Sequence, residues 1–384
     1  MRLIAQYNPR FYPIIGGGET HISNLVKSMK DFNFEIITNA LPSNSLKEKF
    51  SGNTLIRRFL PYDRSLISSN NLIPSKYYFP YRLMNDIIRI YRQKQFIKDS
   101  NYDIIHFHGI GFSGNLLRAD SWINTLLLSR CINNFDYVDT PKILTIHNLF
   151  SPLATNTFYE KYEHYIIDQF DDIICVDRNI ENYVKNYIEL KGHDKKIWFI
   201  PNSVDLDKFP FSKIELKKKL RIGFVGRFEY SRGIDLLQQL IKKLPDFCEL
   251  HITCKPFRIN ENPNIHFHGV IPEDDVPIFL KSVDIIFNPV LVEGISRITL
   301  EAMSSGRPVI MLDKGDRYPV IQSITGYIIK EDINDLLYLL VKINNNREEL
   351  QKLSKTARKI VEDEFGNDVI IPKIKKIYED LIIG

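Results

Sequence analysis

The sequence contains few cysteines and no long hydrophobic run, and these absences argue against two classes of protein. Four cysteines occur among the 384 residues, and Cys131, Cys175, Cys248 and Cys254 form no CxxC pair. We therefore expect reduced thiols in the core instead of a disulfide framework. The longest apolar stretches, such as DDIICV and VDIIFNPVLV, are much shorter than the roughly 20 residues of a membrane-spanning helix. An integral membrane protein is not expected.

A signal-peptide core and a large charge of one sign are missing as well. The segment MRLIAQYNPRF returns to polar residues after a few apolar ones, so we expect a cytoplasmic protein. The formal net charge is +4. Without a concentrated basic stripe, such a small excess does not indicate a nucleic acid as partner.

What the sequence does contain is typical of a globular protein with a large core. Hydrophobic residues make up 44% of the chain, charged residues 26% and aromatic residues 12%. This composition excludes a disordered or collagen-like chain. The length predicts two domains or one large α/β unit.

Strands and helices are expected to alternate along the first half. Buried strands are expected at RLIAQY, FEIITNA, YDIIHFHG, PKILTIHN and DDIICV. Apolar residues at helical spacing predict helices near 81–98 and 114–132. Residues 41–80 show no clear period, and we interpret them as a long loop with room for one helix. The alternation predicts a parallel sheet that is covered on both faces.

The pattern restarts after a polar linker near 203–218. LRIGFVGRF opens a second series of strands and helices, so two doubly wound halves fit better than one sheet. The C-terminal segment DVIIPKIKKIYEDLI is expected to be an amphipathic helix. The pattern leaves open on which half this helix packs.

A glycine-rich segment, GGGETH at 16–21, lies between the first strand and the first helix. Glycines let a ligand approach the backbone, and a helix N-terminus offers free N–H groups to an anion. A tight turn alone also explains the glycines. Because this segment does not match the dinucleotide fingerprint GxGxxG, it argues against a nicotinamide-dependent oxidoreductase.

Two arginines are expected on one loop in the second half. GFVGRFEYSRGIDLL at 223–237 places Arg227 and Arg232 after a strand, where open parallel sheets bind ligands. Two guanidinium groups at that edge can neutralise a diphosphate through bidentate contacts. Arginines are also common on surfaces without any such role.

The most informative stretch is LVEGISRITLEAMSSGRPVIML at 291–312. Glu293 ends a strand, Ser296 is a candidate N-cap, and Glu301 lies inside the helix that Gly306 closes. The free N–H groups of residues 295–298 suit a phosphate, and an ionised Glu301 can accept hydrogen bonds from two ribose hydroxyls.

A short internal repeat places two histidines, two residues apart, in each half of the chain. IIHFHG contains His106 and His108, and NIHFHG contains His266 and His268. Each pair shares one face of a strand, as metal ligands could. The sequence shows no third ligand at convincing spacing, and the doubled architecture explains the repeat without a metal.

The ordered motifs resemble those of family 4 retaining glycosyltransferases. The resemblance rests on GGGETH, DIIHFHG, TIHN, IPNSVDLDKF, VGRFEYSRGIDLL, VEGISRITLEAMSSGRPVI and TGYII. It implies the GT-B fold, which is α/β with two facing Rossmann-like, doubly wound parallel-sheet domains. Residues 1–205 would form the acceptor domain and residues 206–367 the nucleotide-sugar donor domain. The helix 368–384 would pack back on the first domain.

The resemblance also implies a role for each candidate residue. Gly17 would approach the donor phosphate or sugar, and His108 would contact the transferred sugar. Arg227 and Arg232 would hold the diphosphate leaving group, and Glu293 would contact the sugar hydroxyls.

The remaining roles concern the nucleotide part of the donor. Backbone amides of Ile295, Ser296, Arg297 and Ile298 would bind the phosphate. Glu301 would bind the ribose, and the backbone at Val270 would read the base.

Two departures from the family pattern are present. The family usually has lysine where this chain has Arg232, which keeps the charge but changes the donor geometry. It has an aliphatic residue where Arg297 stands, and it often has a smaller one near Ser296. Arg297 would either clash with the donor or add a phosphate contact.

The expected chemistry needs neither a cofactor nor a metal. Breaking the bond between sugar and diphosphate leaves negative charge on the departing oxygens, which arginines and a helix N-terminus stabilise. DLD at 205–207 superficially resembles a metal-binding DxD motif, but it lies in the linker and is not expected to bind metal. Retention of the anomeric configuration is implied by the resemblance alone.

The acceptor is expected to be a polysaccharide, a glycolipid or a lipid-linked glycan. The helix 81–98 interleaves apolar residues with Arg82, Arg89, Arg92, Lys94 and Lys98. Such a helix could place the protein peripherally on the anionic inner face of a membrane. An ordinary helix that covers the sheet explains the same pattern.

Three function classes remain at this point. A hexosyltransferase-like enzyme that uses a nucleoside-diphosphate sugar fits best. A nucleotide-sugar epimerase of the same architecture would act on the donor without any acceptor. A non-catalytic subunit that binds a sugar or nucleotide would neither hydrolyse nor transfer the donor sugar.

Overall fold

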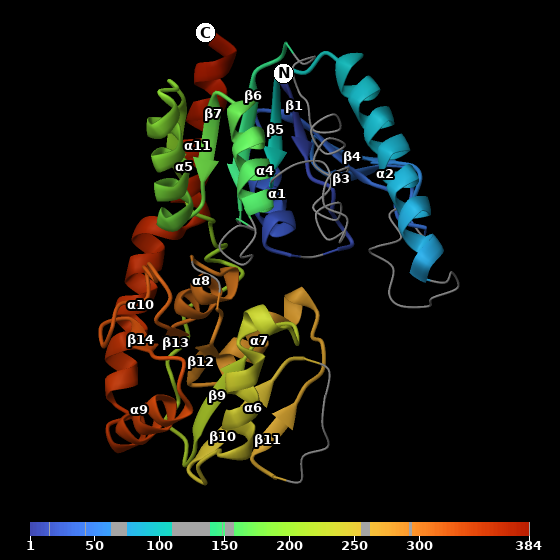
Figure 1. Ribbon diagram of the computed structural model, residues 1–384. Helices are drawn as coiled ribbons and strands as arrows, with labels where there is room; N and C mark the ends of the chain where they lie inside the picture. Colours follow the sequence, from blue (N-terminus) through green and yellow to red (C-terminus); the bar gives the residue numbers. More distant parts are fainter. Residues whose placement is uncertain are drawn as a thin grey trace. The chain divides into compact units, whose positions relative to one another are not determined.

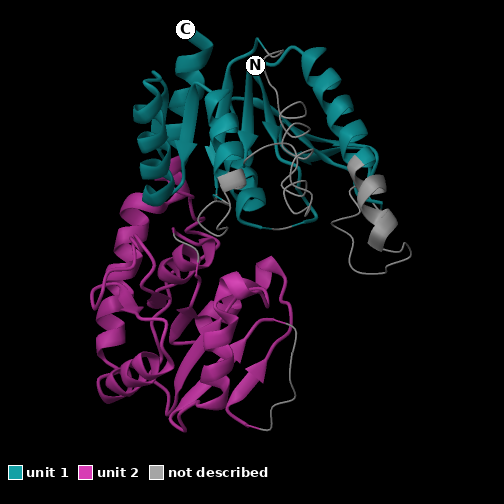
Figure 2. Ribbon diagram, viewed as in Figure 1, with its two compact units in different colours: residues 1–200, 371–384 teal, residues 201–370 magenta. Residues whose placement is uncertain are grey.

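The computed structural model of the chain describes residues 1–14, 16–42, 44–62, 75–109, 139–147, 149, 157–254, 262–291 and 294–383. For residues 75–83 and 157–159 it describes the backbone alone. The chain forms two compact units (Figure 2). Unit 1 comprises Met1–Ile200 and Ile371–Gly384, and unit 2 comprises Pro201–Ile370.

Unit 1 is built on an eight-stranded sheet with the order β3-β4-β2-β1-β5-β6-β7-β8 (Figure 1). The strands are β1 (Leu3–Tyr7), β2 (Asn33–Asn39), β3 (Lys47–Ser51), β4 (Thr54–Phe59), β5 (Ile104–His108), β6 (Lys142–Ile146), β7 (Asp172–Cys175) and β8 (Lys196–Phe199). β3 is antiparallel to β4, and the other pairings of described strands are parallel. The helices are α1 (Gly17–Ser28), α2 (Ser75–Lys98), α4 (Thr157–Asp168), α5 (Arg178–Lys191) and most of α11 (Asn367–Ile383).

The side chains of the central strands alternate between two covered faces. Tyr7 and Phe107 belong to the hydrophobic cluster that includes residues of α2, α4 and α5. Gln6 and His106 point to the opposite face, where both contact the Tyr378 hydroxyl of α11. The polar residues within these buried strands therefore lie on the face that α11 covers.

The interpretation of residues 41–80 as a long loop is wrong, because β3 and β4 form a hairpin there. β4 also pairs in parallel with β2 and so extends the sheet. β3 reads KEKFS and has no buried residue, so it lacks the hydrophobic alternation by which a strand is detected in a sequence. The helix expected at 81–98 begins earlier, at Ser75, and the one expected at 114–132 lies outside the described residues.

Helix α2 also corrects the expected basic surface. Arg89 is only 2% exposed and forms an ion pair with Asp86, one turn earlier. Its Nη1 donates to the Pro61 carbonyl over 3.0 Å. A buried guanidinium with these partners contributes no charge to a surface, so the expectation for Arg89 is wrong. Among the described residues, no helix is long and apolar enough to cross a membrane.

Unit 2 contains a six-stranded parallel sheet with the order β11-β10-β9-β12-β13-β14. The strands are β9 (Leu220–Phe224), β10 (Cys248–Ile252), β11 (Ile265–Phe267), β12 (Ile285–Asn288), β13 (Val309–Leu312) and β14 (Gly326–Ile329). The helices are η4 (Tyr230–Arg232), α6 (Ile234–Lys242), η5 (Glu273–Asp275), α7 (Val276–Ser282), α8 (Arg297–Ser304), α9 (Ile333–Asn345) and α10 (Glu349–Phe365). Helices α6 and α9 belong to one hydrophobic cluster, and α7 and α8 belong to a second.

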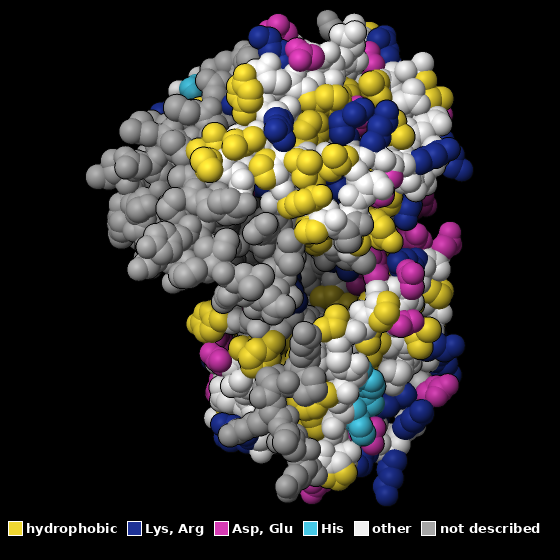
Figure 3. All heavy atoms as spheres, turned by 90° about the vertical axis from the view of Figure 1, so that its right-hand side faces the viewer, with side chains coloured by type: hydrophobic (Ala, Val, Ile, Leu, Met, Phe, Trp, Pro, Cys, Tyr) yellow, Lys and Arg dark blue, Asp and Glu magenta, His cyan; other side chains and the backbone are white. Residues whose placement is uncertain are grey.

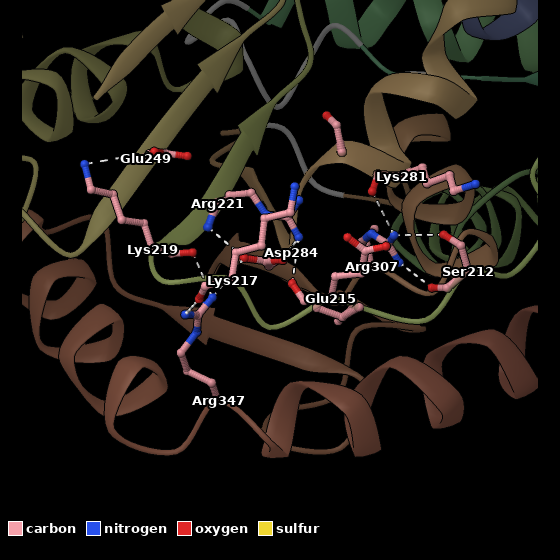
Figure 4. A network of polar contacts seen from close by, with 12 residues as sticks. Ser212, Glu215, Lys217, Lys219, Arg221, Glu249, Lys281, Asp284, Arg307 and Arg347 are labelled. Atoms are coloured by element: carbon pink, nitrogen blue, oxygen red, sulfur yellow. Dashed lines mark hydrogen bonds and ion pairs between the residues drawn. The ribbon is translucent and has the colours of Figure 1, made fainter. Parts of the chain in front are cut away.

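A buried ion cluster joins the amino ends of β9 and β12 (Figure 4). Asp284 is fully buried and accepts hydrogen bonds from the backbone N–H and the Nη2 of Arg221, over 2.8 and 2.5 Å. Arg347 donates to the same carboxylate over 3.1 Å. Because Asp284 bridges two guanidinium groups, this cluster ties the amino ends of these strands to the residues around Arg347. The carboxyl ends of the strands remain for ligand-binding loops.

The chain passes from unit 1 to unit 2 between Ile200 and Pro201, and it returns within α11 between Ile370 and Ile371. The sequence analysis drew these boundaries at 205/206 and 367/368. The acceptor and donor roles of the two parts stay predictions.

The DLD motif forms a turn just inside unit 2. Asp205 Oδ1 accepts hydrogen bonds from the backbone N–H groups of Asp207 and Lys208, both over 3.0 Å. The neighbouring Val204 pairs with the start of α11, because the backbone N–H of Asn367 donates to the Val204 carbonyl over 3.1 Å. A structural turn therefore accounts for the position of Asp205.

Candidate active site

Loops from β9 and β12 meet at the carboxyl edge of the sheet in unit 2. Gly233 has a φ of +68°, and a Cβ there would lie 1.9 Å from the carbonyl oxygen of Pro289. Only glycine therefore permits this close approach. The backbone N–H of Leu291 donates to the Ser231 carbonyl over 3.0 Å and ties the two loops together.

The two predicted leaving-group arginines lie on the first of these loops. Arg227 is exposed and pairs with Glu229 over 3.2 Å. Burial lowers the pKa of Arg232, and the nearby guanidinium groups of Arg227 and Arg297 lower it further. Like charges so placed favour an anion as ligand. The structure therefore brings together three of the predicted donor-binding residues.

Helix α8 begins beside this arginine group. Ser296 occupies the N-cap position, but within the described part of the chain its side chain does not cap the helix. Its hydroxyl instead accepts from Asn288 Nδ2 over 2.7 Å and lies 2.9 Å from Thr299 Oγ1. The Ser296 side chain therefore does not occupy the backbone N–H groups of the helix start, and phosphate binding by residues 295–298 stays a prediction. Ile295 and Ile298 anchor the helix start in the hydrophobic cluster of α7 and α8.

Arg297 covers the carboxylate that was predicted to bind ribose. Arg297 Nε lies 3.0 Å from Oε1 of Glu301, which is 3% exposed. Burial raises the pKa of Glu301, and the Arg297 charge opposes this shift. The sequence analysis allowed a clash or a phosphate contact, whereas the structure shows a third arrangement. The i,i+4 spacing of Arg297 and Glu301 was the sequence signal for it.

Arg317 is a supporting residue that the sequence analysis missed. It is 2% exposed and donates to Val290 O over 3.1 Å and to Gly294 O over 3.4 Å. It therefore holds both sides of the segment that contains Glu293. Glu293 itself lies outside the described residues. No local pattern indicates this role, because Arg317 is distant from the loop in the sequence.

Val270 lies apart from the arginine group. It follows Gly269 and leaves β11, which is the edge strand of the sheet, and its side chain is 72% exposed. β10 separates β11 from β9. The structure therefore places the predicted base-reading residue at the edge of the sheet.

In unit 1 the glycine-rich loop meets a cluster of histidines. Gly17 is exposed, and no described atom lies within 4 Å of a Cβ built on it. A Cβ on Gly18 would lie 3.6 Å from Cδ2 of His147. Gly17 was the predicted position, but the closest approach in this loop is at Gly16, where a Cβ would lie 2.4 Å from Oε2 of Glu19.

His108 ends β5 inside a buried hydrogen-bond network. Its Nε2 lies 2.7 Å from Oε1 of Gln6, and Nε2 of Gln6 donates to the Tyr378 hydroxyl over 2.9 Å. The same hydroxyl lies 2.6 Å from Nδ1 of His106, whose Nε2 lies 2.6 Å from Thr145 Oγ1. With this orientation of the Gln6 amide, His108 carries its proton on Nε2. α11 therefore influences the tautomer of His108.

The second nitrogen of His108 is also occupied. His108 Nδ1 lies 3.2 Å from Nε2 of His147, and His21 packs against both rings. Burial lowers the pKa of His21 to about 4 and that of His147 to about 3, and it holds the pKa of His108 well below its usual range. The cluster is therefore neutral at pH 7.

Sequence reasoning missed Gln6, His21, His147 and Tyr378. A glutamine within the buried strand LIAQY was a usable signal, since a polar residue there requires a partner. His147 belongs to the TIHN motif but was not singled out. Tyr378 lies far from β1 and β5 in the chain, so no local pattern indicates that it contacts them.

Comparisons with known proteins agree with this architecture. Residues 15–208, just over half of the chain, match the family model described as glycosyltransferase family 4. Residues 219–346 match the model described as glycosyl transferases group 1. An uncharacterized glycosyltransferase of Methanocaldococcus jannaschii is 26% identical over 384 residues, which cover 97% of this chain and 96% of that protein.

Two further proteins extend the comparison. The Escherichia coli UDP-Gal:alpha-D-GlcNAc-diphosphoundecaprenol alpha-1,3-galactosyltransferase is 24% identical over 331 residues, with 78% of this chain and 80% of that protein covered. Sucrose-phosphate synthase from Thermosynechococcus elongatus matches over 100% of both chains with a TM-score of 0.78 and 18% identity. At this identity the structural match is evidence for the fold alone.

Proposed function

Because the chain belongs to glycosyltransferase family 4 and has the GT-B fold, we propose that it transfers a hexosyl group from a nucleoside-diphosphate sugar with retention of configuration. The acceptor is a hydroxyl group of a polysaccharide, a glycolipid or a lipid-linked glycan. The observation that carries this proposal is the group formed by Arg227, Arg232 and Arg297 beside the start of α8.

The arginine group suits the charge that the reaction creates. When the bond between the anomeric carbon and the diphosphate breaks, negative charge accumulates on the departing oxygens. Arg227 and Arg232 can donate to these oxygens in pairs, and the helix start adds backbone N–H groups. Such preorganised donors stabilise a transition state most where water is excluded. The transfer step therefore needs no metal ion.

Arg297 and Glu301 would exchange partners when the donor binds. Their 3.0 Å contact occupies the carboxylate in this structure. A diphosphate attracts Arg297, and the released carboxylate can then accept hydrogen bonds from two ribose hydroxyls. This exchange avoids leaving the buried Glu301 carboxylate or the half-buried Arg297 guanidinium unpaired. It also accounts for an arginine at a position where the family has an aliphatic residue.

The remaining candidate residues have proposed roles on the sugar and the base. His108 contacts the transferred sugar as a neutral imidazole, and the contact uses Nδ1, because its 3.2 Å bond to His147 is longer than the 2.7 Å bond to Gln6. Gly17 lets the donor approach the backbone. Glu293 contacts the sugar hydroxyls, and the backbone at Val270 reads the base.

The donor proposal is tested by thermal stabilisation and by product analysis. UDP is the first nucleotide to test, because the name of the Escherichia coli relative includes UDP-Gal. UDP or another nucleoside diphosphate should raise the melting temperature, and the matching donor should give a product of unchanged anomeric configuration by nuclear magnetic resonance. Donor converted without an acceptor would instead indicate an epimerase. Neither transfer nor hydrolysis of any donor would indicate a non-catalytic binding subunit.

We also propose that α2 brings the protein to an anionic membrane surface that holds a lipid-linked acceptor. Met84, Ile87, Ile88 and Tyr91 follow helical spacing and are all exposed, Tyr91 by 61%. The face shown in Figure 3 has hydrophobic side chains interspersed with Lys and Arg over its upper part. Apolar insertion next to basic residues is the usual mode of binding to anionic lipid.

Vesicle binding tests the membrane proposal. The wild-type protein should sediment with phosphatidylglycerol vesicles at low salt, and the double variant Met84→Ser, Tyr91→Ser should bind much less. Tyr338→Ser is the matched control, since Tyr338 is 73% exposed on α9. Wild-type protein that stays in the supernatant, or equal losses in both variants, would contradict the proposal.

A further inference from the structure

A second group of side chains that could bind a ligand lies on the edge strand β11 of unit 2 and on its neighbour β10. Glu249 and His251 are two residues apart on β10, and His266 is the register partner of His251 on β11. One ligand atom of each side chain can be chosen so that all three lie within 4.8 Å of one another. These residues lie outside the arginine group, and the proposed transfer does not use them.

Strand alternation places this group on a partly open surface. Leu250, Ile252 and Ile265 point into the hydrophobic cluster of α6 and α9, so Glu249, His251 and His266 share the opposite face. The chain has three histidines between residues 201 and 370. Figure 3 shows histidine side chains side by side on the molecular surface. The Glu249 side chain is 31% exposed, so an ion in solution can reach the group from its side.

His251 has the features of a ligand that is prepared for a metal. Its Nδ1 lies 3.1 Å from Nε2 of His268. Its Nε2 is buried, has no hydrogen-bond partner among the described residues, and lies 3.9 Å from Oε2 of Glu249. Ring nitrogens of metal-bound histidines are typically oriented in this way by a partner on the other nitrogen. His268 is that partner here.

We propose that Glu249, His251 and His266 bind one Zn²⁺ ion, with water as the fourth ligand and with His268 orienting His251. Two imidazole nitrogens and one carboxylate oxygen favour zinc over magnesium or calcium, which prefer oxygen ligands. Bonds of about 2.0–2.1 Å place tetrahedral ligands about 3.4 Å apart. The Glu249 side chain is 31% exposed and can rotate to close the 3.9 Å gap to His251.

Lys219 competes with the metal for Glu249. Its Nζ lies 4.0 Å from the Glu249 carboxylate (Figure 4), and it is also hydrogen-bonded to Asn264. The nearby Arg221 shares the carboxylate of Asp284 with Arg347, so its charge is compensated only in part. Lys219→Met should therefore strengthen zinc binding, because the carboxylate loses a competing cation.

The bound ion would hold the edge of the sheet together. β11 has only three residues, and among the described strands it pairs with β10 alone. A metal that joins His251 to His266 ties these two strands and fixes the start of the segment that continues to Val270. The role is structural, so the metal-free transfer proposed above does not depend on it.

Calorimetric titration of Zn²⁺ into chelator-treated, dialysed full-length protein tests the site. One equivalent should bind and raise the melting temperature, and Co²⁺ in its place should give visible absorption typical of four-coordinate sites. His251→Gln and His266→Gln should abolish both effects. His268→Gln should weaken zinc by roughly 10- to 100-fold, as expected for a residue that orients a ligand.

His193→Gln is the matched control, because His193 lies 3.5 Å from Asp168 on the surface of unit 1. It should leave zinc binding unchanged. Nucleotide binding by each variant serves as the check that unit 2 is folded. Equal zinc binding in wild type, His251→Gln and His266→Gln would overturn the proposal, as would wild-type protein that binds no zinc. A chelator should lower the melting temperature without stopping transfer, so failure of the zinc site and failure of the proposed function are distinguishable.

Discussion

The same sequence, IHFHG, occurs once in each unit and is used in opposite ways. In unit 1 it lies on β5, in the middle of the eight-stranded sheet, where His106 and His108 are buried and bonded to neutral polar partners. In unit 2 it lies on β11, at the edge of the sheet, where His266 and His268 face His251 across a partly exposed surface. The position of a strand in its sheet thus decides whether a histidine pair becomes part of the core or an available ligand.

The candidate site residues of the two units also differ in their charge. The residues around His108 are neutral at pH 7 because burial lowers their pKa values. The proposed donor-binding residues of unit 2 include the guanidinium groups of Arg227, Arg232 and Arg297, near the start of α8. Substitutions in the histidine network, apart from His108, should therefore act mainly on stability, and those in the arginine group mainly on ligand binding and turnover.

The largest expected effect is on the stability of unit 1. Tyr378→Ala removes a fully buried side chain that bonds to Gln6 and His106, and it should cost about 3–5 kcal/mol of unfolding free energy. The exposed Tyr338→Ala should change it by less than about 0.5 kcal/mol. Denaturant unfolding measures both. Equal costs would show that the network does not stabilise unit 1.

A somewhat smaller effect is expected on turnover through unit 2. Arg227→Ala removes donors to the departing diphosphate and should raise the activation free energy by about 2 to 4 kcal/mol, by analogy with lost oxyanion donors. Because Arg227 is exposed, this substitution should change the unfolding free energy little. Steady-state kinetics of the transfer reaction measures the effect, with the exposed Arg178→Ala of unit 1 as control. An unchanged kcat in Arg227→Ala would show that Arg227 does not stabilise the departing diphosphate.

Nucleotide affinity should depend on Glu301 to a lesser degree. Glu301→Gln keeps the shape of the side chain but not its charge. The loss of charge-assisted hydrogen bonds to ribose costs about 1.5–3 kcal/mol, so calorimetry should show roughly ten- to hundredfold weaker binding of the nucleoside diphosphate. Equal affinity for the ribose and 2′-deoxyribose nucleotides in wild type would argue against ribose recognition at this residue.

Acid should weaken unit 1 through its buried histidines. The pKa of His21 is about 4 in the folded chain and about 6.5 in an unfolded one. Between these values only the unfolded state binds the proton, so stability falls as the pH falls through this window, by about 1.4 kcal/mol per pH unit for each such group. His21→Phe should flatten the curve of unfolding free energy against pH, and the exposed His193→Phe should not. Parallel curves for wild type and His21→Phe would contradict this.

The smallest effect distinguishes the two histidine pairs most directly. In chelator-treated protein, His268→Gln should change the unfolding free energy by less than about 0.5 kcal/mol. His108→Gln disturbs two buried hydrogen bonds and should cost about 1–3 kcal/mol. Similar costs for both would mean that the edge and the centre of a sheet do not differ in the proposed way.

Much of the fold could be predicted from the sequence because parallel strands covered on both faces leave continuous apolar runs. LIAQY, IIHFH and DIIC are mostly apolar runs of this kind, and each is a strand. The hairpin of β3 and β4 could not be predicted, since KEKFS is held by pairing with its neighbour and not by burial. The strand order, which separates the two histidine pairs, is likewise absent from any local pattern.

The candidate site was predictable where its residues are close in sequence. Glu301 and Ser296 could be predicted from the signals of one helix start, and Arg227 and Arg232 from one loop after a strand. Arg317 and Tyr378 act across long stretches of chain, so no spacing rule finds them. The spacing argument against a nicotinamide enzyme was incomplete, because GIGFSG at 109–114 does match GxGxxG. Most of that segment lies outside the described residues, and the family matches identify the chain without it.

The central claim, that the arginine group holds the diphosphate without a metal, is tested most directly by calorimetric titration of UDP and other nucleoside diphosphates in the presence of a chelator. The account predicts that the wild-type protein binds one of them and that the double variant Arg227→Ala, Arg232→Ala binds it at least about tenfold more weakly. Equal affinity of the two proteins, or binding that requires a divalent metal, would contradict it.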